Sequence, residues 1–134
     1  MKARSIWIGG YRSVVDNLRG HSVVMDLPPD QNGEDTGATA LEFAVMALAG
    51  CVTTIYKIVA EKRHLDIKGM KVELEAEKGE KTITEVKGNV EVITDADQKA
   101  VETVLKLTLD ICPVGIIFQN AGIKSTWNIV AKKP

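Results

Sequence analysis

The uncharged stretch over residues 43–56 constrains the fold more than any other feature of this chain. Its first ten residues, 43–52, are apolar on every side of a helix, whereas a surface helix would carry one apolar stripe and a polar back. A helix that spans a bilayer needs about 20 apolar residues, so this shorter run favours a core helix. We therefore expect a helix over residues 40–61 that the rest of the protein covers on all sides.

Two residues mark the start of this helix. Thr39 is the expected N-cap, and Glu42 stands three residues later, where it completes a Thr-x-x-Glu capping box. The residues that lead up to it, 28–39, are rich in Pro, Asp, Asn, Gly, Glu and Thr and show no apolar periodicity. They are expected to form a surface loop.

The chain has two cysteines in different settings. Cys51 lies inside the apolar helix, where burial would raise its pKa unless a cation reaches it. Cys112 precedes Pro113, which is suited to open a helix over residues 113–120, and a helix N-terminus favours a thiolate. Local geometry thus predicts that Cys112 has the lower pKa. The low number of cysteines and the absence of a secretion signal favour a reducing cytoplasm. In that compartment the two cysteines either are unreactive residues packed in the core or take part in thiol chemistry.

The remaining elements follow from alternating and helical apolar patterns. Short β-rich runs separated by turn residues predict an antiparallel meander, and an alternating pair of runs predicts a hairpin. The order βββ-α-ββ-α-α-β indicates one α+β domain over residues 1–134. The expected strands are 3–8, 11–16, 21–27, 70–77, 84–92 and 123–130, and a second helix opens at residues 94–97 and reaches residue 111.

Charge and composition exclude several classes of function. Seventeen basic and eighteen acidic residues are interspersed and leave a net charge of −1, so we expect no nucleic-acid or membrane partner. His21 and His64 lack the close ligand spacing of a structural zinc site, and no metal is expected. His21 is better interpreted as a strand residue, and His64 as a cation at a helix C-terminus.

Residues 37–51, which end in Ala-Gly-Cys, together with the distant Cys112-Pro113 pair resemble the OsmC/Ohr family, and more its general OsmC-like branch than its organic hydroperoxide resistance branch. The resemblance extends over nearly the whole chain. It implies antiparallel sheets around a buried central helix and an intertwined homodimer with two active sites at the subunit interface. It also implies thiol peroxidase activity on organic hydroperoxides and hydrogen peroxide, with no bound cofactor.

The resemblance assigns roles to individual residues. Cys51 would attack the peroxide and become a sulfenic acid, and Cys112 would form a disulfide with it that an external dithiol, such as a lipoyl-type reductant, reduces. An arginine near the N-terminus would hold the thiolate; Arg12 is the first choice and Arg19 the rival. Glu42 is the candidate carboxylate. It stands nine residues before Cys51, one position closer than the glutamate of the hydroperoxide resistance branch, and Leu41 occupies the matching position in this chain.

Spacing and local chemistry leave alternatives open. Nine helical residues place Glu42 about 13 Å from Cys51 on the opposite side of the helix, so Glu42 serves either catalysis or only the cap. The resemblance and the local chemistry also disagree on which sulfur attacks, and attack by Cys51 requires an arginine beside it. The rival functions are a non-enzymatic dimeric binding module for a small hydrophobic ligand, and a thiol protein that acts on another electrophile.

Overall fold

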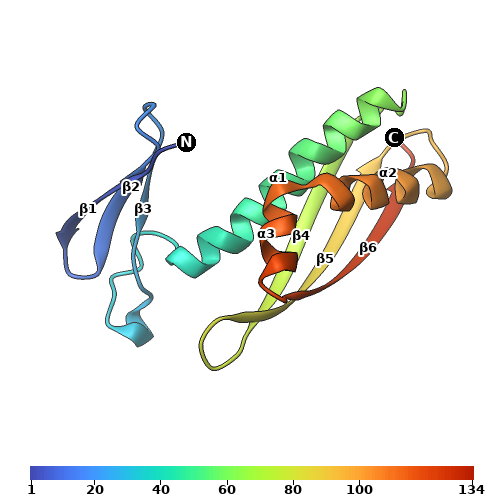
Figure 1. The fold of residues 1–134 in the computed structure, drawn as a ribbon. Helices are drawn as coiled ribbons and strands as arrows, with labels where there is room; N and C mark the ends of the chain where they lie inside the picture. Colours follow the sequence, from blue (N-terminus) through green and yellow to red (C-terminus); the bar gives the residue numbers. More distant parts are fainter. The chain divides into compact units, whose positions relative to one another are not determined.

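The structure is a computed structural model that describes residues 1–134, and its contacts divide the chain into two compact units, Met1–Ala44 and Val45–Pro134 (Figure 1). The order of strands and helices is β-β-β-α-β-β-α-α-β, with a short 3-10 helix, η1, over Pro29–Gln31. This confirms the predicted order and the α+β class. The expectation of a single domain stays a prediction.

The first unit is built around an antiparallel sheet of three short strands in the order β1-β2-β3. These are β1 (Arg4–Gly9), β2 (Arg12–Asp16) and β3 (Ser22–Met25), and they confirm the predicted meander. Gly9 and Gly10 link the first two strands with φ angles of +110° and +55°, a conformation that glycine adopts without steric cost.

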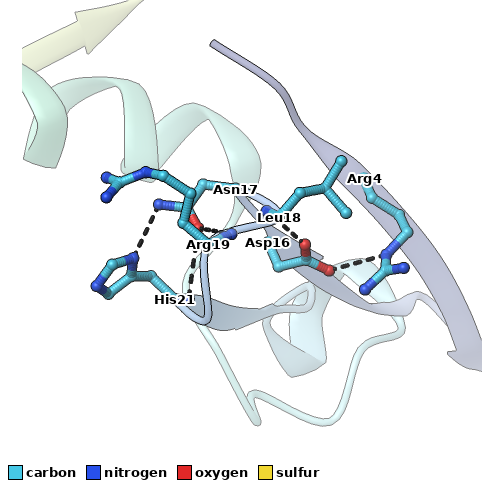
Figure 2. Close-up of polar contacts among 6 residues, drawn as sticks. All are labelled: Arg4, Asp16, Asn17, Leu18, Arg19 and His21. Atoms are coloured by element: carbon cyan, nitrogen blue, oxygen red, sulfur yellow. Dashed lines mark hydrogen bonds and ion pairs between the residues drawn. The ribbon is translucent and has the colours of Figure 1, made fainter.

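The turn between β2 and β3 is held by side chains (Figure 2). Asp16 Oδ1 accepts a hydrogen bond from the Leu18 backbone N–H at 2.8 Å, and Asn17 Oδ1 accepts one from the Arg19 N–H at 2.9 Å. Arg4 Nε donates to the other Asp16 oxygen at 3.1 Å. Side-chain oxygens that bond the backbone two residues ahead are typical of such turns.

The sheet of the first unit contains no buried apolar residue. Every residue of its three strands is half-buried or exposed, and Asp26 is the one buried residue of this unit, at 3% exposure. Trp7 is 73% exposed and Ile6 49%. Apolar side chains that stay in contact with water add little to the stability of a fold.

The second unit contains a mixed sheet in the order β4-β5-β6. Strands β4 (Gly69–Lys78) and β5 (Ile83–Ile93) form the predicted antiparallel hairpin. Strand β6 (Lys124–Lys132) pairs with β5 in parallel, so the prediction of purely antiparallel sheets is wrong here. The two helices between β5 and β6 carry the chain back to the end of the sheet where β5 began, and a helical crossover is the usual link between parallel strands.

The buried apolar side chains all belong to the second unit and come from both its sheet and its helices. Helix α2 (Gln98–Ile111) starts at Asp97, whose side chain accepts a hydrogen bond from the Ala100 N–H, and Ile111 at its end is 52% exposed. Buried side chains are contributed by α1 (Leu48, Val52, Tyr56, Val59, Ala60), β5 (Ile83, Val86, Val90, Val92), α2 (Val101, Val104, Leu105), Cys112 and Phe118 of α3 (Pro113–Asn120).

The central helix α1 (Ala40–Lys62) is buried along one face only. Its buried residues recur at spacings of three or four, whereas Met46 is 53% exposed and a Cβ atom added at Gly50 would meet nothing within 4 Å. The prediction of a helix covered on all sides therefore does not hold within one chain. By length and composition alone α1 could cross a membrane, but core helices of soluble proteins pass the same test.

Candidate functional site

The fold brings the two cysteines together although they lie 61 positions apart in the sequence. Cys51 lies near the middle of α1, and Cys112 lies between the end of α2 and the start of α3. The Cys112 Sγ donates to the Cys51 Sγ across 3.0 Å, and both residues are free thiols. A disulfide requires about 2.05 Å between the sulfurs, so a small movement would join this pair.

The break between α2 and α3 fixes the position of Cys112. Its backbone N–H donates to the Thr108 carbonyl and so completes α2, and Pro113 then takes the first position of α3 as predicted. The Cys112 sulfur also accepts a hydrogen bond from the Gly115 N–H at 3.4 Å. Helix N-termini offer such free N–H groups to an anion or a capping atom.

The acidity predicted for Cys112 is nevertheless wrong. Burial raises the pKa of the Cys112 thiol to about 11, and its hydrogen bond to Cys51 acts in the same direction, while the N–H of Gly115 offsets only part of the shift. The Cys112 side chain is fully buried, whereas Cys51 is half-buried. Desolvation at this site therefore outweighs the helix N-terminus, and Cys51 is the more exposed of the two residues.

The two candidate arginines both lie in the first unit. Arg12 begins β2, and its Nη1 lies 3.4 Å from the Glu34 Oε2. The Arg12 side chain is one-third exposed, but its Nε is buried and has no hydrogen-bond acceptor. Arg19 lies in the exposed turn of Figure 2, where its backbone N–H, not its guanidinium, makes the hydrogen bond. That either arginine reaches Cys51 stays a prediction.

Glu42 forms the predicted capping box at the start of α1. Its Oε1 accepts a hydrogen bond from the Thr39 N–H at 2.9 Å, and its own N–H donates to the Thr39 Oγ1 at 3.1 Å. The two contacts satisfy donors that a helix start leaves without partners. One oxygen of the Glu42 carboxylate is thus engaged by the backbone, and a catalytic role for this residue stays a prediction.

Sequence reasoning missed two acidic residues of the first unit, one of which pairs with Arg12. Asp26 is buried, and Glu34 belongs to the segment that was assigned only to a surface loop. A signal was present: Asp26 lies two residues before Pro28 and Pro29, and the segment also contains Gly33 and Gly37, a pattern suited to tight backbone turns. A Cβ atom at Gly33 would lie 1.8 Å from the Leu27 carbonyl oxygen, so glycine is required there.

The structure contains no group of three or more His, Cys, Asp or Glu side chains placed to hold a metal ion. His21 contacts the side chain of Asn17 at 3.0 Å, and His64 follows the end of α1 with a φ angle of +56°.

The sequence from residue 33 to 128 matches the family model for OsmC-like proteins. No curated protein matches the sequence at a significant level. Among solved structures, an OsmC-like protein from Mycoplasma pneumoniae is similar to this chain with a TM-score of 0.84 at 11% identity, and the match covers 98% of this chain and 95% of the other.

Two further similar structures are organic hydroperoxide resistance proteins. The protein from Legionella pneumophila has a TM-score of 0.74 at 15% identity, with 98% of this chain and 95% of the other covered. The protein from Elizabethkingia anophelis has a TM-score of 0.73 at 12% identity, with 98% and 94% covered. Identities this low establish a shared fold and leave the chemistry to be argued from the site.

Proposed function

Because the chain belongs to the OsmC-like protein family, we propose that it is a cysteine-based peroxidase that reduces organic hydroperoxides and hydrogen peroxide. The observation that carries the proposal is the 3.0 Å separation of the Cys51 and Cys112 sulfurs, one half-buried and the other fully buried. The names of the Legionella and Elizabethkingia proteins support a redox role of this kind. The free thiols suit a reducing compartment such as the cytoplasm.

In the first step the Cys51 thiolate attacks the terminal oxygen of the hydroperoxide. The S–O bond forms as the O–O bond breaks, the alcohol leaves with a proton, and Cys51 becomes a sulfenic acid. Cys51 is the better nucleophile of the pair because peroxide can approach its half-buried sulfur, while the pKa of about 11 keeps Cys112 protonated at neutral pH.

In the second step Cys112 resolves the sulfenic acid. The S–S bond forms between the two sulfurs, the S–O bond of Cys51 breaks, and the hydroxyl leaves as water with the proton of the Cys112 thiol. The separation of 3.0 Å favours this step over a second oxidation of Cys51 by peroxide. An external dithiol then returns both thiols by two exchange reactions and is itself oxidised to a disulfide.

The thiolate of Cys51 requires a cation, which the neighbouring residues of α1 do not supply. Lys57 on the same helix is paired with Glu61 at 3.1 Å. We assign the role to Arg12, whose side chain is one-third exposed, and keep the exposed Arg19 as the alternative.

We also propose that the protein acts as an intertwined homodimer. The sheet β1-β2-β3 exposes Ile6, Trp7 and Val23, and α1 exposes Met46 and Ile58, so apolar surface is uncovered on both units. A second copy of the chain would bury this surface, and a site at the interface would draw residues from both copies.

The decisive experiment measures the consumption of cumene hydroperoxide with a dithiol as reductant. We expect Cys51→Ser to abolish turnover, and Cys112→Ser to allow one stoichiometric oxidation without a disulfide. Thr53→Ser, on the exposed side of the same helix, is the matched control and should retain activity. Equal activity in all variants would reject the peroxidase. A small hydrophobic ligand that binds all of them equally would then favour a binding module.

A further inference from the structure

Strand β6 lies at an edge of the sheet β4-β5-β6 and has β5 as its one neighbouring strand (Figure 1). An edge strand presents unpaired backbone N–H and C=O groups, to which a strand of another molecule can bind. Residues 125–131 carry no charge and no proline, and Val130 among them is 46% exposed. Segments of this length and composition pair readily with copies of themselves. The edge of β6 is therefore a surface through which copies of the chain could join.

The side chain of Gln98 bonds to this edge as a neighbouring strand would. Its Nε2 donates to the Ile129 carbonyl at 2.8 Å, and its Oε1 accepts from the Ala131 N–H at 2.9 Å. In a parallel pair of strands, the N–H and C=O of one residue make the same two bonds to residues that lie two positions apart. The amide of Gln98 thus takes the place of a strand residue opposite Val130, on the side of β6 that does not face β5.

Gln98 is held in this position by its place at the start of α2. The preceding residue, Asp97, caps the helix by accepting a hydrogen bond from the Ala100 N–H at 2.8 Å. The Gln98 Nε2 also donates to the Glu102 Oε1, one helical turn further along, at 2.8 Å. An amide nitrogen has two hydrogens, so both are engaged and the direction of the side chain is fixed.

Charge gives this half of the strand little protection. Lys124 and Lys132 flank the uncharged residues 125–131, and charged residues are a common means of preventing edge strands from pairing. The Lys132 Nζ, however, lies 2.6 Å from the Glu91 Oε2 of β5, so part of its charge is neutralised there. Protection of residues 129–131 then depends on Gln98.

We propose that Gln98 closes residues 129–131 of the β6 edge against a strand from a second copy of this chain. In such an addition of strand to strand, backbone groups of the second copy would make the bonds that the Gln98 amide now makes. The same side chain therefore limits the ways in which copies of the protein associate. Neither cysteine takes part, so this role is independent of the proposed peroxidase activity.

The test compares the molar mass of full-length variants by sedimentation velocity over a range of protein concentrations. Gln98→Ala should form species of about twice the wild-type mass or more as the concentration rises, because the edge is then open. Gln119→Ala makes the same substitution at an exposed position of α3 and is the matched control. Its mass should remain that of the wild type. A Gln98→Ala protein with the wild-type mass at every concentration would reject the proposal.

A second substitution determines whether the association uses β6. Val130→Lys places a charge beside the lost contact, and in the Gln98→Ala background it should restore the wild-type mass. Continued association of the double variant would mean that another surface joins the copies, and it would overturn the proposal. Circular dichroism checks that each variant retains the fold.

Hydrogen exchange of the wild-type protein tests the contact without any substitution. The N–H groups of Trp127 and Ala131 face the same side of β6, because the direction of these groups alternates from one residue to the next. We expect the Ala131 N–H to exchange at least about tenfold more slowly, since Gln98 bonds it. Equal exchange rates of the two groups would contradict the closure of this edge by Gln98.

Discussion

The two three-stranded sheets of this protein differ in what stabilises them. Sheet β4-β5-β6 belongs to a unit with fourteen buried apolar residues, which its strands and helices share. Sheet β1-β2-β3 belongs to a unit in which the one buried residue is an ionised aspartate, Asp26. Apolar burial is the main favourable contribution to folding, so the second unit has a core of its own and the first does not.

The two units therefore hold their candidate site residues in different ways. The second unit holds the two sulfurs at 3.0 Å through packed helices, and that distance needs no partner. The first unit holds its candidate arginine through one ion pair, with Glu34, and it leaves apolar side chains such as Trp7 exposed. Under the proposed function the thiol pair is preformed within one chain, while the cation depends on assembly.

The largest expected effect is on the core of the second unit. Leu48→Ala, at a side chain that is 2% exposed, should lower the free energy of unfolding by about 2–5 kcal/mol through lost burial and the cavity it leaves. Urea denaturation measures this change. Ile6→Ala in the first unit, where the side chain is 49% exposed, is the matched comparison and should cost less than about 1 kcal/mol in the monomer.

A smaller effect is expected on dimer formation when a charged residue is introduced into the first unit. Trp7→Arg should weaken a dimer by about tenfold or more in dissociation constant, because a large exposed aromatic side chain is replaced by a charge. Sedimentation equilibrium of the variant and the wild type measures it. Lys81→Arg, in the turn between β4 and β5, is a control without loss of charge. An identical monomeric state in both proteins would contradict the dimer and leave the first unit uncovered.

The last expected effect concerns pH. The pKa of Cys112 rises on folding from 9.0 to about 11, so the neutral thiol is favoured in the native state. Its contribution to stability is fully present below pH 9 and is lost as pH rises from 9 to 11. Thermal unfolding across this window should show a larger decrease for the wild type than for Cys112→Ser. Parallel curves would indicate that Cys112 is not desolvated in the folded protein.

Local patterns predicted the elements well, because a strand or a helix cap depends on residues close in sequence. The alternation of Met70, Val72 and Leu74 predicted β4, and Thr39 with Glu42 predicted the cap of α1. The parallel pairing of β6 was missed because its residues alternate in the same way whichever direction the neighbouring strand runs.

The site was less predictable because it depends on burial and on contacts between distant residues. The pairing of Cys51 with Cys112 followed from a family resemblance, and no pattern in either segment alone indicates it. The pKa of Cys112 was predicted in the wrong direction, since the helix start is visible in the sequence and the depth of burial is not. Glu34 was missed because only the folded loop brings it to Arg12.

Because Cys112 lies between α2 and α3, its redox state also affects the stability of the fold. A disulfide between Cys51 and Cys112 would link α1 to the junction of α2 and α3. It would close a loop of the chain that spans 61 positions and contains β4, β5 and α2. By the chain-entropy relation such a closure disfavours the unfolded state by about 4 kcal/mol. The oxidised protein would then resist heat and proteases better than the reduced one, so the fold would be most stable when peroxide has oxidised the two cysteines.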